Sequence, residues 1–215
     1  MTAGVSGIVL AGGRSSRFGS DKLAARYGDV PLLDRAVAAI GRQSTEVIVV
    51  VAPSDERVLP PAAVPVRRAV DPEPFGGPLV GLLAGLEAAR EPIILVAGGD
   101  MPTMSDAVLG ALVRALVSAE QSAQAAVLVQ RGVAQPLPAA VRNGAATQAA
   151  RALIADGERS LVALVARLPT RRVEEIEWRS LDPEGETLRD VDRPGDIPPR
   201  SARPRPPRPP RTSRK

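Results

Sequence analysis

The 215-residue chain contains neither histidine nor cysteine. Their absence excludes Ser-His-Asp and Cys-His catalysis, imidazole general bases, haem and iron–sulfur ligation, and the zinc sites that depend on nitrogen and sulfur. A catalytic metal must therefore be held by oxygen, and oxygen ligands suit hard cations such as magnesium or manganese. The lack of cysteine also excludes disulfides, which is compatible with a reducing cytosol.

The basic residues are unevenly distributed. Residues 198–215 hold seven basic residues, seven prolines and no acid, whereas the preceding residues carry 21 basic and 24 acidic side chains, a net charge of −3. A segment of this composition cannot bury enough apolar surface to fold, so we expect a disordered Arg/Pro-rich tail at 198–215. We interpret it as a solubilising extension, with an anion-binding or SH3-ligand arm as the alternative.

Long apolar runs are absent as well. None approaches the roughly 18 residues that a membrane span needs, and the first residues lack the basic-then-apolar pattern of a secretory signal. We therefore expect a soluble, cytoplasmic protein without membrane contacts.

Short β-branched runs alternate with helical patterns between residues 5 and 197, which predicts βαβ units and a mainly parallel sheet. No repeat or linker divides this stretch, so we expect a single α/β domain over residues 1–197. The predicted strands are Val5–Leu10, Glu46–Ala52, Val66–Val70, Pro92–Ala97, Ala125–Gln130, Leu137–Val141 and Arg172–Trp178. The predicted helices are Leu32–Ile40, Pro78–Ala89, Ser105–Ala119, Ala145–Ile154 and Ser160–Leu168.

The first predicted strand runs directly into a glycine-rich turn, LAGGRSSRFGSDK, that ends at Lys22. Gly12 and Gly13 allow a sharp bend and close approach of a ligand, and the amides of such a turn can bind oxyanions. Arg14, Arg17 and Lys22 add positive charge. The turn matches neither the P-loop nor the GxGxxG pattern, and plain turn geometry is the alternative interpretation.

Lys22 is unusual in this chain, because 26 of its 28 basic residues are arginine and the other lysine is Lys215. A compact ammonium can follow phosphate oxygens where a guanidinium fork does not fit. We therefore predict that Lys22 binds phosphate.

A carboxylate ends another buried strand, in the segment IILVAGGD that closes at Asp100. Ligands of open α/β sheets lie beyond the carboxyl ends of the strands, where both Asp100 and the glycine-rich turn should meet. An acid at this place can hold Mg²⁺ together with phosphates and water, although Asp before a proline-started helix is also a common turn residue.

Together these motifs resemble the molybdenum cofactor guanylyltransferases, the MobA family of MobA-like nucleotidyltransferases. LAGGRSSRFGSDK corresponds to the family signature, with Phe18 in place of methionine. In chain order, the other matching segments are GPLVGL from Gly77, the strand-end Asp100-Met101-Pro102, QPLPAAV, GERSL and LRDVDRPGDI. The resemblance covers residues 5–197 and implies a three-layer α/β/α, mainly parallel Rossmann-like nucleotidyltransferase sheet.

The resemblance also implies a reaction, in which GTP and molybdopterin-bound molybdenum cofactor give the guanine dinucleotide cofactor and pyrophosphate. Mg²⁺ is the implied cofactor, with contacts to cofactor-delivery or acceptor enzymes possible and nucleic acid not expected. The implied catalytic residues are Arg17, Lys22 and Asp100. The implied nucleotide-binding residues are Leu10, Ala11, Gly12, Gly13, Arg14, Lys22, Asp71, Gly77, Pro78, Leu79 and Asp100.

The closing segment differs from the family pattern. Asp190 and Asp192 replace the usual asparagines, and this form is more similar to cytidylyltransferases. Asp192 is therefore either a second magnesium ligand or an acid flanking a helix. The alternative functions are a related nucleotidyltransferase that uses CTP or another phosphorylated acceptor, and an inactive nucleotide-binding adaptor.

Overall fold

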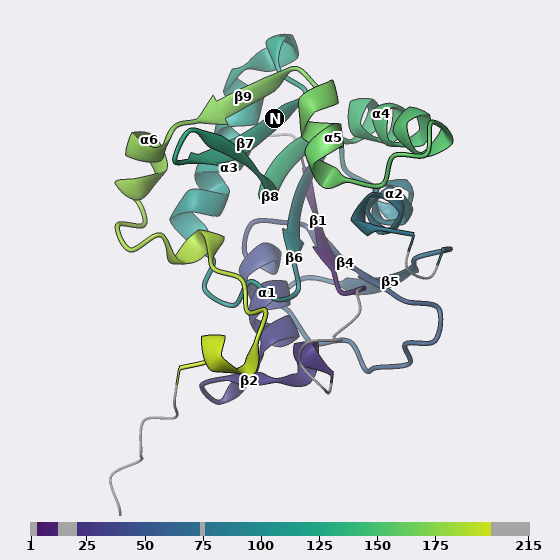
Figure 1. Cartoon of the computed structure of the whole chain (residues 1–215), viewed down its shortest axis with the longest axis vertical. Coiled ribbons are helices and arrows are strands. Elements are labelled where there is room, and N and C mark those ends of the chain that lie inside the picture. Colours follow the sequence, from purple (N-terminus) through teal and green to yellow (C-terminus); the bar gives the residue numbers. More distant parts are fainter. Residues whose placement is uncertain (1–3, 13–20, 74–75, 199–215) are drawn as a thin grey trace, which may run out of the picture.

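A mainly parallel sheet organises the chain. The computed structural model describes residues 4–12, 21–73 and 76–198, and these contain a seven-stranded sheet in the order β5-β4-β1-β6-β8-β7-β9 (Figure 1). Its strands are β1 (Val5–Leu10), β4 (Glu46–Val51), β5 (Val66–Val70), β6 (Ile93–Gly98), β7 (Ala125–Gln130), β8 (Val133–Arg142) and β9 (Thr170–Val173). β5, β4, β1 and β6 are parallel, as are β7 and β9, whereas β8 is antiparallel to both of its neighbours. A separate small hairpin pairs β2 (Arg26–Tyr27) with β3 (Val30–Pro31).

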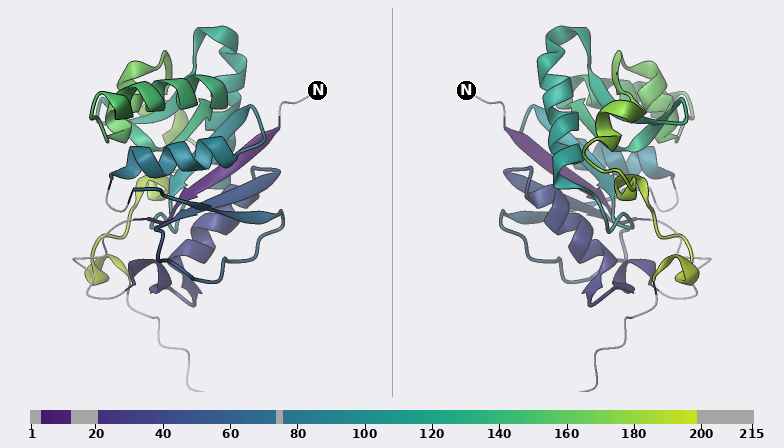
Figure 2. Two further views of the ribbon diagram at one scale, coloured as in Figure 1. Left: turned by 90° about the vertical axis from the view of Figure 1, so that its right-hand side faces the viewer. Right: turned by 90° about the vertical axis from the view of Figure 1, so that its left-hand side faces the viewer.

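Helices cover both faces of the sheet and give a three-layer α/β/α arrangement, which confirms the predicted fold class (Figure 2). α1 (Leu32–Gly41) and α3 (Asp106–Ser118) pack on one face, and α2 (Pro78–Ala88), α4 (Asn143–Ala155) and α5 (Leu161–Arg167) pack on the other. Successive strand residues point to opposite faces, so in β1 Ile8 belongs to the α2 side and Val9 to the α1 side. In the described ranges no helix has the length and apolar character that a membrane crossing requires.

One predicted element is wrong. Residues 172–178 are predicted as a strand, but β9 ends at Val173 and α6 (Glu175–Arg179) follows. Glu174 and Glu177 form a capping box, in which the Glu177 carboxylate accepts the Glu174 amide at 2.7 Å. Trp178 is fully buried, and its indole donates to the carbonyl of Val129 on β7 at 2.8 Å. The capping box and the buried indole therefore favour a helix docked on the sheet over a longer strand.

The remaining predicted strands and the five predicted helices are present, with ends shifted by at most a few residues. The hairpin of β2 and β3 carries no prediction, because two-residue strands are too short to show a hydrophobic period. The predicted core face of α2 is confirmed, since Leu79, Leu82 and Leu86 are buried and Leu83 packs partly buried against them.

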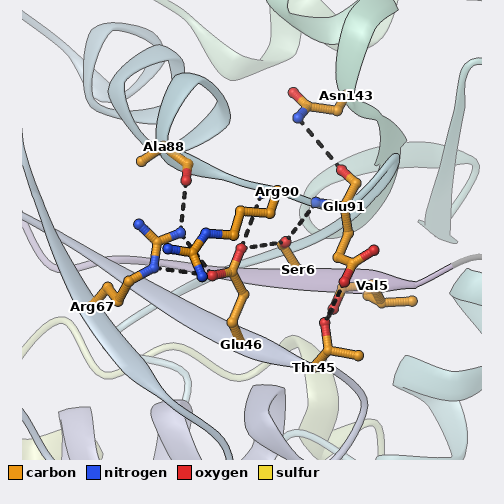
Figure 3. Close-up of polar contacts among 9 residues, drawn as sticks. All are labelled: Val5, Ser6, Thr45, Glu46, Arg67, Ala88, Arg90, Glu91 and Asn143. Carbon is orange, nitrogen blue, oxygen red and sulfur yellow. Dashed lines mark hydrogen bonds and ion pairs between the residues drawn. The ribbon is translucent and has the colours of Figure 1, made fainter.

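A buried carboxylate ties the strands together at the amino edge of the sheet (Figure 3). One oxygen of Glu46 accepts hydrogen bonds from the Ser6 hydroxyl at 2.8 Å and the Arg90 amide at 3.0 Å. The other accepts from Nε and Nη2 of Arg67 at 3.0 and 2.7 Å. The Ser6 oxygen in turn accepts the Glu91 amide at 3.1 Å. These bonds join β1, β4, β5 and the turn before β6.

The hydrogen bonds outweigh the cost of burying this charge. Burial alone raises the pKa of Glu46, but the bonds from Arg67, Ser6 and the Arg90 amide lower the pKa below its ordinary value. A carboxylate whose pKa is lowered on folding stabilises the fold at pH values above its unfolded-state pKa of about 4.3. That contribution is lost as the pH falls through the lower, folded-state pKa.

We expect Glu46→Gln to lower the free energy of unfolding by about 1–3 kcal/mol at pH 7, because the amide cannot satisfy the Arg67 guanidinium. Urea unfolding measures this value, and the difference from the unsubstituted protein should shrink as the pH falls below about 4. Glu87→Gln is the matched control. Glu87 pairs with Arg151 at 2.9 Å, but these side chains are 47% and 63% exposed. Glu87→Gln should lower the free energy of unfolding by less than about 1 kcal/mol. Equal effects of the two substitutions would contradict this account.

Candidate active site at the carboxyl edge of the sheet

Three parallel strands end level with one another at the edge opposite Glu46. Leu10 pairs with Gly98 at the ends of β1 and β6, and the Gly99 amide donates to the Leu10 carbonyl at 2.9 Å. The Ala11 amide donates to the carbonyl of Val50 on β4 at 2.8 Å. The chain therefore leaves all three strands at the same place, which is where open α/β sheets bind ligands.

Lys22 lies at the centre of this edge. It begins a short 3₁₀ helix, η1 (Lys22–Ala24), whose N-cap residue Asp21 accepts the Leu23 amide at 3.1 Å. The Lys22 ammonium lies 2.9 Å from Oδ2 of Asp100 and 2.8 Å from Oδ1 of Asp192. The structure therefore brings together the lysine and the two acids that the sequence predicts for this site.

Asp100 is positioned by the glycines before it. A Cβ atom on Gly98 would lie 2.5 Å from Oδ1 of Asp100, so only glycine leaves room for the carboxylate to fold back over the strand end. The side chain of Asp100 remains 31% exposed, and that of Lys22 is 13% exposed. The acid thus borders the open edge while the lysine lies deeper.

Asp192 reaches the site because the closing segment of the chain docks there. The Val191 amide donates to the carbonyl of Asp100 at 3.0 Å, and the Val191 side chain is fully buried. Asp196 accepts the Asp192 amide at 2.9 Å. Burial, followed by the negative charges of Asp192 and Asp100, raises the pKa of the neighbouring Asp190 carboxyl. The closing segment therefore adds acids to the same edge.

The charge state of Lys22 reflects these neighbours. Burial lowers the pKa of the ammonium, but its hydrogen bonds to Asp192 and Asp100 and their negative charges together raise the pKa above the ordinary lysine value. Lys22 is therefore a permanent cation at neutral pH. Its partners are carboxylates that it can exchange for other anionic oxygen atoms.

A cavity of about 230 Å³ opens beside the lysine. Five of its lining residues are predicted nucleotide ligands: Leu10, Ala11, Gly12, Lys22 and Asp100. The other five, Asp21, Leu23, Ala52, Asp55 and Arg57, carry no prediction. Asp55 and Arg57 belong to the long loop after β4. This loop has no hydrophobic period or motif from which the sequence could predict them.

Four predicted nucleotide-binding residues, in two segments of the chain, are not among the residues lining this cavity. Asp71 follows β5, where its Oδ1 accepts the Glu73 amide at 3.0 Å. Burial, followed by the Glu73 charge, raises the pKa of the Asp71 carboxyl. The segment Gly77, Pro78 and Leu79 begins α2.

The start of α2 is held against the start of α5. Gly77 has φ of 90°, and a Cβ atom there would lie 2.7 Å from Cβ of Arg159, so glycine is required. The Leu79 amide donates to the Arg159 carbonyl at 3.2 Å. GPLVGL and GERSL, which are 80 residues apart in the chain, therefore contact each other. The predicted ligands Gly13, Arg14 and Arg17 lie outside the described residues.

The match to known proteins gives the class of enzyme. The family model for the MobA-like NTP transferase domain matches residues 7–173. A probable molybdenum cofactor guanylyltransferase of Chloroflexus aggregans is 35% identical over 202 residues, which cover 90% of this chain and 91% of that protein. The molybdenum cofactor guanylyltransferase of Burkholderia vietnamiensis is 33% identical over 180 residues, covering 81% and 87%. The protein is therefore a nucleotidyltransferase.

Solved structures share the fold. Molybdopterin-guanine dinucleotide biosynthesis protein A of Archaeoglobus fulgidus superposes with a TM-score of 0.71 at 20% identity, over 89% of this chain and 94% of that chain. The 2-C-methyl-D-erythritol 4-phosphate cytidylyltransferase of Thermus thermophilus gives a TM-score of 0.63 at 20% identity, over 88% and 94%. By sequence, the chain belongs to the molybdenum cofactor guanylyltransferase family of MobA-like NTP transferases.

We expect Asp192→Asn to lower the pKa of Lys22, because the ammonium loses a charged partner. Lysine labelled with ¹³C at Cε reports this pKa by NMR, and Lys22 and Lys215 are the two lysines of the chain. Because the Asp192 side chain is 54% exposed, the free energy of unfolding should change by less than about 1 kcal/mol. Asp106→Asn, which removes the partner of Arg42, is the control and should leave the Lys22 titration unchanged. An unchanged pKa in Asp192→Asn would contradict the ion pair.

Proposed function

We propose that the protein transfers GMP from GTP to a molybdopterin-bound molybdenum cofactor, releasing pyrophosphate, with Mg²⁺ as cofactor. The family supplies the reaction class. The observation that carries the proposal for this chain is the Lys22 ammonium held between Asp100 and Asp192 beside Gly12. In this reaction an oxygen of the acceptor's terminal phosphate bonds to the α-phosphorus of GTP, and the bond to the leaving pyrophosphate breaks.

Such a transfer needs positioning and charge neutralisation more than proton removal, because the attacking phosphate oxygen is already ionised. It can therefore proceed in a chain without histidine. Lys22 would neutralise phosphate oxygens as they gain charge, with Arg17 as the second predicted cation. The raised pKa of Lys22 keeps the ammonium protonated for this role.

The surroundings of Gly12 support the proposal that phosphate binds here. A Cβ atom on Gly12 would have no described atom within 4 Å, so the packing of the described residues does not itself require glycine there. Open space beside a backbone with no Cβ allows close approach of a ligand. Leu10, Ala11 and Gly12 would border the phosphates, together with the predicted ligands Gly13 and Arg14. Asp71 and Gly77–Leu79 remain predicted contacts to the rest of the nucleotide.

The acids fit a magnesium ion. Asp100 and Asp192 point one oxygen each at the same cation, Lys22, and oxygen is the donor that Mg²⁺ prefers. Among the described residues no group of three or more acidic side chains is arranged to hold a metal, so protein ligands would be few. That suits an ion whose other ligands are phosphates and water. When bound, Mg²⁺ would neutralise charge on the phosphates, and Lys22 could exchange its carboxylate partners for phosphate oxygens.

CTP is the alternative nucleotide. The acids Asp190 and Asp192, where guanylyltransferases usually carry asparagine, favour it. Both acids lie at the edge that holds Lys22, which is the edge proposed here to bind the nucleotide and the metal.

We expect Lys22→Ala and Asp100→Ala each to lower kcat by at least about 100-fold, because each removes a charge that balances the phosphates. Pyrophosphate release with GTP, Mg²⁺ and molybdopterin measures the rate, and circular dichroism checks the fold. Arg151→Ala, which breaks an exposed ion pair on α4, is the control and should retain full turnover. Activity retained in both site variants would refute the assignment.

We also expect GTP with Mg²⁺ to raise the melting temperature more than CTP with Mg²⁺. A ligand that binds only the folded state at 100 times its Kd stabilises that state by about 2.7 kcal/mol. Differential scanning fluorimetry at matched concentrations compares the two nucleotides. Equal shifts would remove the basis for choosing guanine.

A further inference from the structure

Two side chains give the cavity its side-chain N–H donors. Of the ten described residues that line it, Lys22 and Arg57 are the two with a nitrogen in the side chain. Lys22 lies with Asp100 at the ends of β1 and β6, whereas Arg57 belongs to the loop after β4. The two donors therefore reach the cavity from different segments of the chain.

The Arg57 guanidinium is held in place within its own loop. Oδ2 of Asp55 accepts from Nε and Nη2 of Arg57 at 2.7 and 2.6 Å, and Oδ1 accepts the Arg57 amide at 3.0 Å. Arg68 on β5 donates to the carbonyl oxygens of both Asp55 and Arg57. The Asp55 amide donates to the carbonyl of Ala52 at 3.0 Å. The guanidinium is therefore oriented before any ligand arrives, which lowers the entropic cost of binding.

Arg57 also lies against the turn that carries the lysine. Its Nη2 is 3.4 Å from Oδ2 of Asp21, the N-cap residue of η1. The side chain is 21% exposed, so it is a wall of the cavity and not a free surface arginine. Nη1 of Arg57 is bound by neither aspartate.

The charge around Arg57 favours a neutral ligand group over phosphate. Asp55 and Asp21 carry two negative charges, and Arg57 and Arg68 carry two positive charges, so the charges at this wall balance. A triphosphate at this wall would meet no excess of positive charge, whereas at Lys22 a divalent cation can add it. An uncharged nucleobase needs no such excess, and an acceptor atom on its edge can meet the Nη1 N–H groups of Arg57. Because the Asp55 carboxylate already accepts hydrogen bonds from Arg57, this side of the cavity offers a ligand the remaining N–H donors of Arg57.

We propose that Arg57 is a specificity-determining residue whose Nη1 donates a hydrogen bond to O6 of the guanine of GTP. This inference rests on the proposed function. Asp55 and Asp21 engage Nε and Nη2, so Nη1 is the guanidinium nitrogen that can reach an acceptor on the base. Adenine presents an amino donor in place of O6, so Arg57 discriminates against ATP.

The test compares nucleotide binding by unsubstituted protein, Arg57→Ala, Arg57→Lys and the control Arg151→Ala. Calorimetry with Mg²⁺ measures Kd for GTP, ITP, ATP, CTP and inorganic tripolyphosphate. ITP keeps O6, and tripolyphosphate has no base. We expect the unsubstituted protein and the control to prefer GTP and ITP over ATP. Arg57→Ala should weaken GTP and ITP by about 10- to 150-fold and leave ATP and tripolyphosphate within about twofold.

Arg57→Lys keeps the charge but lacks the guanidinium that Asp55 holds in place, so it should also lose the preference for GTP and ITP. Equal weakening of all triphosphates and of tripolyphosphate would overturn the proposal in favour of a phosphate contact. Unchanged GTP binding, no initial preference for GTP, or a loss confined to CTP would overturn it as well. In steady-state kinetics the substitutions should raise KM for GTP with little change in kcat. Failure of the unsubstituted protein to turn over any triphosphate would refute the proposed function, while the binding comparison would still decide the role of Arg57.

Discussion

The ion pairs of Lys22 with Asp100 and Asp192 are the contacts on which the candidate site depends. Asp100 and Asp192 follow Lys22 by 78 and 170 residues, and each of the three reaches the site from a different segment. β6 delivers Asp100, η1 delivers Lys22, and the closing segment delivers Asp192 through the Val191 amide. Under the proposed function, a metal ion would take the place of the ammonium between the two carboxylates, and the ammonium would move to the phosphates.

The amino edge of the sheet is held by buried polar contacts, whereas the carboxyl edge carries the candidate site. At the amino edge, the buried Glu46 carboxylate accepts hydrogen bonds from Ser6, Arg67 and the Arg90 amide, so it fixes the relative positions of β1, β4 and β5. At the carboxyl edge, Lys22 and Asp100 remain partly accessible. The strand β6 places Asp100 just beyond its end, and the ion pair with Asp100 holds the Lys22 ammonium beside it.

Much of this arrangement is predictable from the sequence. The buried strands show as continuous β-branched runs, and Lys22 is conspicuous because the chain otherwise uses arginine. The helix around Trp178 is not predictable, because a capping box and a tertiary hydrogen bond decide it. The place of Arg57 in the cavity wall is not predictable either, because it depends on contacts with Asp55 and Asp21 in the folded protein. The family resemblance predicts nucleotide contacts at Asp71 and Gly77, but sequence cannot show that neither is among the residues lining the cavity beside Lys22.

The most direct measurement of the central claim is a crystal structure with a non-hydrolysable GTP analogue and Mn²⁺, whose anomalous signal locates the metal. The account predicts Mn²⁺ bound to the carboxylates of Asp100 and Asp192, with the Lys22 ammonium within hydrogen-bond distance of a phosphate oxygen. Nucleotide and metal bound elsewhere, with Lys22 still between its two aspartates, would contradict it.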